Sequence, residues 1–251
     1  MGLIGLGKMG LSHLAIANSL ELFSVTRLCD VNGFVGSAIS RYVNAGFSRD
    51  YEVMCGADDV DAIVISVPTP LHFPMAAAAL RARKHVFLEK PLTLDASQSR
   101  ILSDQARDER VHTQVGYINR FNPVFAHLHH IITEETFGKI IYYSCEMRGN
   151  VVGEKGAEGW RKDHSSGGGC LYEYGSHCID LALFLFGNVA ELNRSTLASR
   201  VSTSVEDIVD AEVTHASGVR GRLFIDWADL SYRTATNNVI VGTESTVILA
   251  N

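Results

Sequence analysis

A carboxylate and an imidazole lie one helical turn apart in a segment that is otherwise apolar. Glu173 and His177 belong to a predicted helix from Leu171 to Phe186, and Asp180 follows three residues later. Spacings of four and three place such side chains on one face of a helix. Because buried helices normally exclude charge, this face is predicted to carry acid–base chemistry. The alternative is a helix start, with Glu173 in the first turn and His177 in the core.

Glycines surround this predicted face. Gly167, Gly168 and Gly169 remove three consecutive Cβ atoms before the helix, which predicts that the chain passes close to a ligand. Gly175 lies inside the helix, where glycine costs about 1 kcal/mol relative to alanine. It is predicted to permit another close approach to the backbone. An ordinary flexible loop is the alternative for the glycine run.

A lysine follows a predicted buried strand over residues 85–88. Lys90 stands between Glu89 and Pro91 directly after that strand. Ligands of doubly wound sheets bind beyond the carboxyl ends of the strands, so Lys90 is predicted to point into a ligand crevice. A surface lysine at a strand end is the alternative.

The segment Gly5–Gly10 carries glycines at its first, third and sixth positions. In a strand-to-helix turn these permit a tight bend, approach to a dinucleotide pyrophosphate, and close helix packing. The phosphates then lie at the positive end of the helix. A flexible glycine turn is the alternative. The predicted contact residues of this loop are Gly5, Gly7, Lys8, Met9 and Gly10.

Asp30 lies twenty residues beyond Gly10, at the end of the second predicted strand. An acidic residue there accepts hydrogen bonds from the adenosine ribose hydroxyls and repels a 2′-phosphate. Val31 and Asn32 follow it, without a directly adjacent arginine. NAD is therefore the expected cofactor, with NADP as the alternative. The other interpretation of Asp30 is a strand-end turn residue.

The elements that must position these residues fall into two groups. Strands expected at 3–4, 25–29, 62–67, 85–88 and 111–116 alternate with helices at 11–20, 75–83 and 95–107. That alternation predicts a doubly wound parallel sheet of the Rossmann type. The pattern then changes near residue 117, so the expected domains are 1–117 and 118–251.

The second domain is expected to hold an open, mainly antiparallel sheet with one covered face. Only one strong helix, 171–186, is predicted among its strands. The strands are expected at 139–148, 189–199, 208–216, 220–227 and 238–249.

The composition limits the partners. The chain has 251 residues, 46% of them hydrophobic, and a formal net charge of −6. No basic stripe is present, so nucleic acid is not an expected partner. The longest apolar run, Leu181 to Phe186, is too short to cross a bilayer, and the N-terminus does not have the order of a signal peptide.

The five cysteines form no Cys-x-x-Cys pair, which favours a reducing, cytoplasmic compartment. Another possible use of cysteine is a zinc site with His164, Cys170, His177 and Cys178, which are close in sequence. Their spacing fits no standard zinc pattern, so no metal is expected.

With these motifs in this order, the chain resembles the Gfo/Idh/MocA oxidoreductases, which include glucose-fructose oxidoreductase and inositol dehydrogenases. The resemblance covers the whole chain. It implies a Rossmann domain and an α/β domain whose large open sheet often serves oligomerisation. The motifs are Gly5–Gly10, Val67–His72, Glu89–Pro91, Gly116–Pro123, Trp160–Arg161 and Gly167–Asp180.

The resemblance also implies roles for single residues. Lys90 and His177 match the catalytic lysine and histidine of the family, and Thr69, His72 and Glu89 match positions lining the nicotinamide half of the site. Further residues that are candidates to line the substrate pocket are Tyr117, Arg120, Trp160 and Arg161. Arginines there would suit a phosphate or carboxylate, with surface arginines as the alternative.

The implied activity is NAD(P)-dependent oxidation of a hydroxyl on a sugar, cyclitol or nucleotide sugar. His177 would remove the hydroxyl proton, Lys90 would stabilise the developing alkoxide, and Glu173 would orient the lysine or the substrate. One alternative is a glycosidase of the same family that oxidises its substrate transiently, with Glu173 as an extra acid or base. The other is a non-catalytic NAD-binding sensor or scaffold.

Two features depart from the family pattern. Glu173 stands where the family usually has aspartate, which would move the carboxylate by roughly 1 Å. The chain also stops soon after Val239–Thr243. Apart from the family pattern, only four residues precede Gly5, whereas a first strand of typical length would begin several residues earlier. We therefore expect it to lack its natural start and the C-terminal segment that packs back on the Rossmann domain.

Overall fold

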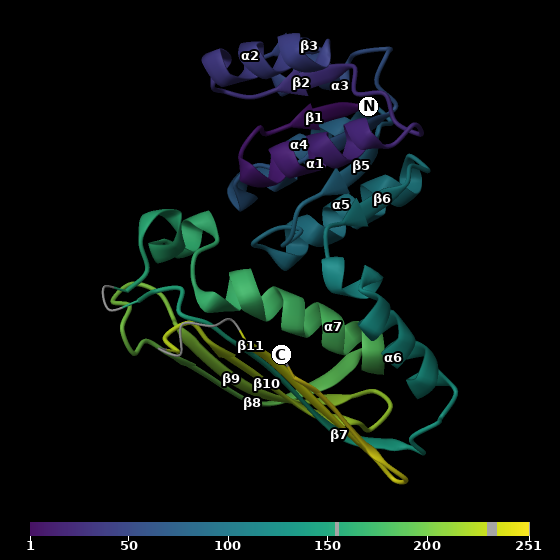
Figure 1. Ribbon diagram of the computed structural model, residues 1–251, viewed down its shortest axis with the longest axis vertical. Helices are drawn as coiled ribbons and strands as arrows, with labels where there is room; N and C mark the ends of the chain where they lie inside the picture. The colour runs from purple at the N-terminus through teal and green to yellow at the C-terminus, as the bar shows by residue number, and fades with distance from the viewer. Residues whose placement is uncertain (154–155, 230–234, 251) are drawn as a thin grey trace. The chain divides into compact units, whose positions relative to one another are not determined.

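The computed structural model describes residues 1–153, 156–229 and 235–250. The chain folds into two compact units, Met1–Gly116 and Tyr117–Asn251. Each unit contains one six-stranded sheet. Helices pack on both sheets (Figure 1).

The first unit is built around a parallel sheet with the strand order β3-β2-β1-β4-β5-β6. Its central strands are short and apolar because both faces are covered: Leu3, Ile63 and Ile65 are completely buried. The predicted doubly wound sheet is thereby confirmed. The strands are β1 (Gly2–Ile4), β2 (Arg27–Cys29), β3 (Gly46–Ser48), β4 (Ala62–Ile65), β5 (His85–Leu88) and β6 (Thr113–Val115).

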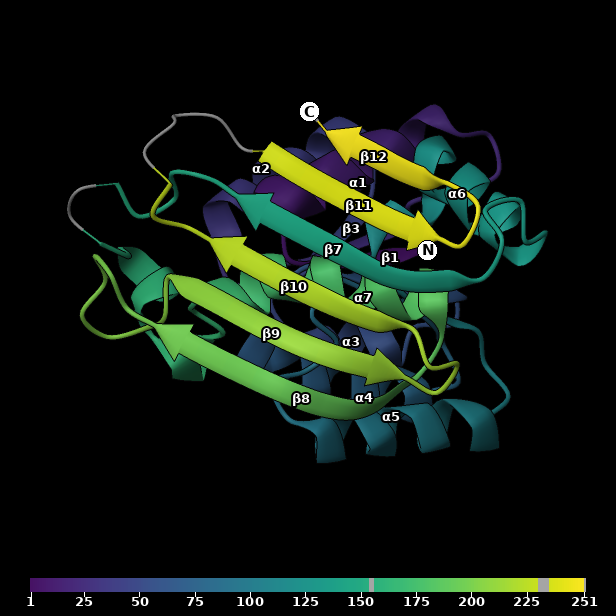
Figure 2. The ribbon, with the colours of Figure 1, turned by 90° about the horizontal axis from the view of Figure 1, so that it is seen from below.

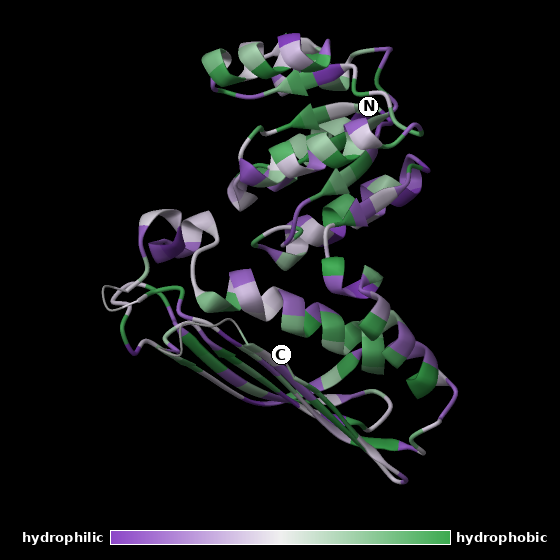
Figure 3. Ribbon diagram, in the orientation of Figure 1, coloured by the Kyte–Doolittle hydropathy of each residue, from purple (hydrophilic) through white to green (hydrophobic). Residues whose placement is uncertain are grey.

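Helices alternate with these strands along the chain. The alanines of α4 are almost fully buried, since small side chains let a helix approach the sheet closely. Figure 3 shows hydrophobic residues along the strands and a mixture of polar and apolar residues on the helices. The helices are α1 (Lys8–Ser19), α2 (Gly33–Val43), α3 (Tyr51–Cys55), α4 (His72–Arg81) and α5 (Ala96–Asp108), with a 3-10 turn at Thr69–Leu71.

The second unit carries a mixed sheet with the order β12-β11-β7-β10-β9-β8. Among the described strand pairs of this second sheet, only β7–β10 is parallel. Figure 2 looks onto the face of this sheet opposite α7 (Ser176–Phe186). The strands are β7 (Ile140–Arg148), β8 (Val189–Ala198), β9 (Ile208–His215), β10 (Arg220–Asp226), β11 (Ala235–Gly242) and β12 (Thr246–Ala250).

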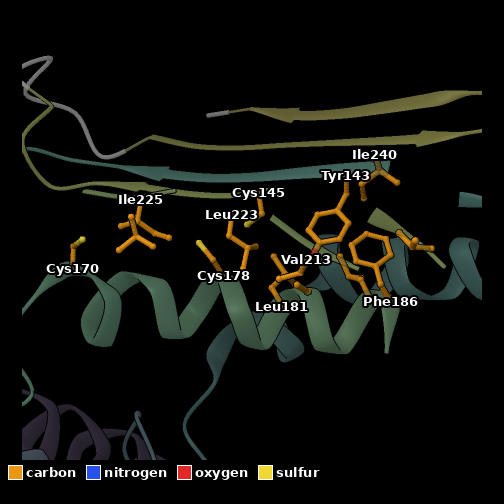
Figure 4. Close-up of a cluster of buried hydrophobic side chains, with 14 of the residues drawn as sticks. Tyr143, Cys145, Cys170, Cys178, Leu181, Phe186, Val213, Leu223, Ile225 and Ile240 are labelled. Carbon is orange, nitrogen blue, oxygen red and sulfur yellow. The ribbon is translucent and has the colours of Figure 1, made fainter. Parts of the chain in front are cut away.

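Helix α7 forms the core of the second unit together with the sheet. Figure 4 shows Cys178, Leu181 and Phe186 of α7 directed at the side chains of the strands. The ring of Phe186 stacks on Tyr143 with a centroid distance of 4.2 Å. The Tyr143 hydroxyl is 2.9 Å from Nε2 of the buried His215. This bond satisfies the hydroxyl inside an apolar core.

Three expectations for the second unit are corrected. The predicted helix 171–186 begins as a π-helix, Leu171–Gly175, and continues as α7. A second helix, α6 (Pro123–Thr133), starts where the Asn122 side chain accepts a hydrogen bond from the amide of Val124. The expected strand 238–249 is a hairpin of β11 and β12, because a bond from the amide of Gly242 to the carbonyl of Ser245 closes a turn.

Across the described residues, no helix has both the length and the apolar character needed to cross a membrane.

Candidate functional site

The glycine loop joins the end of β1 to the start of α1. Gly5 has a φ of +90°, and a Cβ on Gly10 would collide with the Gly5 carbonyl oxygen. In contrast, a Cβ on Gly7 would meet no atom within 4 Å. Gly7 caps α1 without any side-chain acceptor for the first amides. The start of α1 therefore has room and amide donors for a diphosphate, which fits the cofactor that the motif predicts.

Asp30 lies at the end of β2, beside this loop. Its Oδ2 accepts a hydrogen bond from the amide of Leu6 at 2.6 Å, and its Oδ1 accepts one from the amide of Asn32 at 2.7 Å. Both oxygens keep further acceptor capacity, because an ionised carboxylate has about four lone-pair sites. The carboxylate is thus fixed next to the loop, and its contact with a ribose stays a prediction.

Lys90 follows β5 at the same edge of the sheet as the glycine loop. The preceding Glu89 accepts a hydrogen bond from the Lys90 amide at 3.2 Å. Its other oxygen lies 2.6 Å from Nε2 of His13 on α1. Burial acts to raise the pKa of Glu89, but the His13 bond and charge and the Lys90 amide outweigh it and hold that pKa below its usual value. The Lys90–Pro91 peptide is cis.

Sequence reasoning did not single out His13. It lies 76 residues from Glu89 in the chain, and no local pattern links the two. The one available signal is its place on α1, three residues after Gly10.

His72 lies at the start of α4 and contacts two neighbouring turns. Its side chain is buried, with 1% exposed. Nε2 lies 3.0 Å from the carbonyl oxygen of Val67, and Nδ1 lies 2.9 Å from that of Pro91. Burial lowers its pKa, and the carbonyls partly offset this effect. His72 therefore connects two turns through its ring nitrogens, and its predicted place beside the nicotinamide stays a prediction. Thr69 is half-buried in the 3-10 turn, and its predicted role also stays a prediction.

In the second unit, Glu173 is paired with Arg161. The guanidinium donates two hydrogen bonds to the carboxylate, Nε to Oε2 at 2.8 Å and Nη2 to Oε1 at 2.9 Å. The guanidinium carbon also lies 4.8 Å from the ring centroid of Trp160. Such fork geometry is a strong, oriented ion pair. Glu173 thus holds the Arg161 side chain in one orientation, and a contact of Arg161 with a substrate stays a prediction.

Asp180 forms a corresponding pair with Arg120, in the 3-10 turn Ile118–Phe121. The two forked bonds measure 2.7 and 2.9 Å. His177 lies on α7 between Glu173 and Asp180 in sequence, and its ring meets Tyr117 edge-on at 6.4 Å. Burial raises the pKa of Tyr117, with a contribution from Asp180. Glu173, His177 and Asp180 therefore lie on one stretch formed by the π-helix and α7, and the predicted side chains Tyr117, Arg120 and Arg161 contact that stretch from other segments.

The glycines before this helix have a different cause from the predicted one. A Cβ on Gly168 would collide with the backbone carbonyl of Arg161, and one on Gly169 would collide with the Glu206 carboxylate. A Cβ on Gly175 would face Leu171 at 3.1 Å and Ile225 at 3.8 Å. The close approaches are thus made by the protein itself.

Glu206 is a further residue that the sequence did not reveal. It is buried, and its Oε1 accepts a hydrogen bond from the amide of Leu171 at 2.9 Å. This carboxylate satisfies an amide at the start of the π-helix. Glu206 therefore helps to hold the segment that carries Glu173 and His177.

Within residues 1–153, 156–229 and 235–250, no three His, Cys, Asp or Glu side chains are gathered so as to hold a metal ion. Of the four residues considered for zinc, His164 lies 3.3 Å from Glu206. Cys170 and Cys178 are buried in the core, and burial raises the pKa of the Cys170 thiol.

Lys90 belongs to the first unit and His177 to the second. Each is placed within its own unit, so their meeting at one substrate hydroxyl stays a prediction.

Two family models match the two halves of the chain. Residues 1–117 match a family model described as "Oxidoreductase family, NAD-binding Rossmann fold", and residues 125–248 match the "GFO/IDH/MocA C-terminal domain". An inositol 2-dehydrogenase of Salmonella typhimurium (strain LT2) is 30% identical over 142 residues, which cover 55% of this chain and 42% of that protein.

Two further proteins are similar over a larger share of the chain. A scyllo-inositol 2-dehydrogenase (NAD(+)) of Bacillus subtilis (strain 168) is 35% identical over 187 residues, 73% of this chain and 53% of that protein. The solved structure of a levoglucosan dehydrogenase in complex with NADH has a TM-score of 0.91 and 23% identity, covering 99% of this chain and 72% of that one. At that identity the likeness shows the fold alone.

The chain spans about half the length of these two curated relatives, 42% of one and 53% of the other. Its two halves match the two domains of one family in the order that the family models describe. The chain therefore belongs to the Gfo/Idh/MocA oxidoreductase family, and its N-terminal half is an NAD-binding Rossmann fold.

Proposed function

We propose that this chain catalyses hydride transfer between NAD and a hydroxyl-bearing carbon of a sugar or cyclitol. The observation that carries the proposal is the common edge of the parallel sheet. The glycine loop follows β1, Asp30 follows β2, and Lys90 follows β5. The carboxyl ends of such strands are where ligands of this fold bind. The relatives named for inositol support the substrate class.

The residues of the two units would divide the proton chemistry. The nicotinamide ring, when bound, supplies the hydride acceptor. His177 would take the proton of the substrate hydroxyl, since a neutral imidazole is a suitable base near neutral pH. Lys90 would donate a hydrogen bond to the same oxygen and stabilise its developing negative charge. Glu173, held by Arg161, would keep the helix start that carries His177 in place.

We infer that the substrate is an uncharged polyol. A phosphate or carboxylate group would be bound by the forked donors of an arginine. Arg120 and Arg161, the two arginines proposed for that role, are each held in a forked pair with a carboxylate of the same unit. An anionic substrate at either guanidinium would have to share that positive charge with the carboxylate already paired to it, which disfavours sugar phosphates, sugar acids and nucleotide sugars.

The glycosidase alternative is less well supported. It needs Glu173 as an extra acid or base, and both oxygens of that carboxylate accept hydrogen bonds from Arg161. A non-catalytic NAD sensor is distinguished by experiment, as tight NADH binding without turnover of any polyol.

The test is NADH formation with a panel of cyclitols, neutral sugars, sugar phosphates and nucleotide sugars. We expect turnover of neutral polyols by the unchanged chain and its loss in His177→Ala. His127→Ala is the matched control, because this histidine is exposed on α6 of the same unit. Turnover of nucleotide sugars alone would contradict the substrate class, and full activity of His177→Ala would contradict the role of the imidazole.

We further propose that the chain forms homo-oligomers through the open sheet of the second unit. Every residue of β8 is exposed, including Leu192 and Leu197 with 58% and 53% of their surfaces accessible. Exposed edge strands with apolar side chains are normally covered by a partner. Light scattering should give a mass above 27.4 kDa, and Leu192→Lys should shift it toward the monomer. A monomer at working concentration would contradict this proposal.

For the location we propose the cytoplasm. All five cysteines are buried free thiols, as is usual in a reducing compartment. Cell fractionation tests this point, and recovery of the protein in an oxidising compartment would contradict it.

A further inference from the structure

A hydrogen bond joins the helix that starts at the glycine loop to the turn that carries Lys90. His13 lies on α1, three residues after Gly10, and its Nε2 is 2.6 Å from Oε1 of Glu89. The two side chains are 22% and 15% exposed. Both therefore lie largely away from water, where such a bond is stronger than at the surface.

The roles of the atoms in this bond are determined by their chemistry. An ionised carboxylate only accepts hydrogen bonds, so the Nε2 of His13 donates. The imidazole is also fixed by Phe87, whose ring meets it edge-on at a centroid distance of 5.1 Å. The direction of the donated hydrogen bond is thus set by the packing of α1 on β5.

The second oxygen of Glu89 continues the connection to the lysine. It accepts a hydrogen bond from the Lys90 amide at 3.2 Å. Gly116 leaves room for this arrangement, since a Cβ there would lie 3.3 Å from the same oxygen and 3.2 Å from Phe87. The carboxylate therefore has one imidazole on one oxygen and the lysine's own backbone on the other.

The next residue is held from a different helix. The carbonyl oxygen of Pro91 lies 2.9 Å from Nδ1 of His72, at the start of α4. The turn around Lys90 is thus fixed at both ends, by His13 through a side chain and by His72 through the backbone. Of the two imidazoles, His13 is the one that starts from the cofactor helix.

We propose that His13 is a positioning residue for Lys90, which acts by holding the Glu89 carboxylate and with it the backbone of the Glu89–Lys90–Pro91 turn. The kinetic part of this inference rests on the proposed function. Because α1 begins at the glycine loop, the same bond fixes the lysine turn relative to the dinucleotide-binding element. A misplacement of about 1 Å in a catalytic group costs on the order of 100-fold in rate. Loss of the His13 side chain, which acts on Lys90 through Glu89, should therefore lower the rate measurably.

The kinetic test compares His13→Ala with His13→Gln, whose side-chain amide presents a donor at a similar reach. We expect His13→Ala to lower kcat and kcat/KM equally, by about 10- to 100-fold, with the Kd for NADH little changed. His13→Gln should recover most of that loss. Ser12→Ala is the matched control on α1, since Ser12 contacts only the Lys8 carbonyl among the hydrogen bonds described. The double variant His13→Ala/Glu89→Ala should be no slower than Glu89→Ala, because both substitutions remove the same His13–Glu89 hydrogen bond.

A second readout does not need turnover. Hydrogen exchange of the Lys90 amide, followed by mass spectrometry on its peptide, should speed up in His13→Ala and not in Ser12→Ala. If no polyol is oxidised but this exchange changes, the proposed function fails and the positioning role stands. Unchanged exchange together with unchanged kcat in a folded His13→Ala would overturn the inference, as would equal impairment of His13→Ala and His13→Gln.

Discussion

In the first unit the candidate ligand-binding groups are mostly backbone, whereas in the second they are charged side chains paired with one another. The glycine loop offers amides at the start of α1 and open space beside Gly7. The second unit instead sets Glu173 against Arg161 and Asp180 against Arg120. A backbone site depends on the absence of side chains, and a side-chain site depends on partners that come from distant segments.

This difference affects how each site tolerates change. Adding atoms should harm the first unit most, because its function requires empty space. Removing atoms should harm the second unit most, because a lost partner leaves a largely buried charge without its counter-ion. The predictions below test this contrast, from the largest expected effect to the smallest.

The largest effects are expected in the glycine loop. Gly10→Ala places a Cβ onto the Gly5 carbonyl, so we expect loss of NADH binding and a fall of about 1–3 kcal/mol in the free energy of unfolding. Gly7→Ala meets no protein atom and should keep its stability, while NADH binding weakens at least about tenfold. Fluorescence titration with NADH and urea unfolding by circular dichroism separate the two outcomes. Unimpaired NADH binding by Gly7→Ala would show that the loop does not hold the cofactor.

In the second unit, Gly169→Ala should be the most damaging glycine change. The residue has a φ of +98°, and a Cβ would collide with the Glu206 carboxylate. Left-handed strain of about 1–2 kcal/mol adds to the collision. Gly218→Ala is the control, because Gly218 has a φ of +86° and its added Cβ would meet nothing within 4 Å.

The measurement for this pair is urea unfolding followed by tryptophan fluorescence. Both tryptophans, Trp160 and Trp227, belong to the second unit, so the signal reports that unit. Equal destabilisation by Gly169→Ala and Gly218→Ala would mean that backbone strain alone accounts for the glycine at position 169.

A smaller effect is expected from breaking the Arg161–Glu173 pair. Arg161→Ala leaves a carboxylate that is 17% exposed without its forked donor, and we expect a loss of about 1–3 kcal/mol in the free energy of unfolding. The double variant Arg161→Ala/Glu173→Gln should recover part of the lost free energy of unfolding, because the unpaired negative charge is then removed. Arg194→Ala, whose side chain is 53% exposed, should cost no more than about 1 kcal/mol. The argument fails if the two arginine variants have the same urea midpoint.

The smallest effect concerns acid sensitivity at Asp207. This carboxylate is completely buried and accepts hydrogen bonds from the amides of Arg200, Val201 and Ser202 at 2.6, 2.8 and 2.7 Å. Burial acts to raise its pKa, but these bonds outweigh burial and hold the pKa below its ordinary value.

A lowered pKa in the folded state means that the stabilisation is complete above the unfolded value, about 3.9, and is lost as the pH falls through the folded value. Asp207→Asn should therefore cost about 1–2 kcal/mol at pH 7, and the difference from the unchanged chain should shrink below about pH 4. A difference that stays constant down to the acid limit would contradict this origin.

The contrast between the units also explains what the sequence could predict. The β-branched run ending at Ile65 and the glycine spacing of Gly5–Gly10 are local patterns, and both led to the observed strands and turn. Helix α2 was missed because Phe34 and Tyr42 on it are exposed, 87% and 91%, so its apolar residues do not mark a buried face.

Long-range partners could not be predicted in the same way. The bond of His13 to Glu89 spans 76 residues, and that of the Leu171 amide to Glu206 spans 35. The glycines before the π-helix pointed correctly to a close approach, but composition does not say whether a ligand or a buried carboxylate makes it. The spacing along one helix face singled out Glu173 and Asp180 in the sequence. Their arginine partners, Arg161 and Arg120, could be identified only from the structure.

The most direct test of the account is transfer of deuterium from a neutral polyol, labelled at the carbon that bears the hydroxyl, to NAD. We predict that the unchanged chain forms deuterated NADH. Lys90→Ala and His177→Ala should each slow this transfer by on the order of 100-fold or more while still binding NADH. Transfer at the full rate in both variants would contradict the central claim that a lysine of the first unit and a histidine of the second act on one substrate hydroxyl.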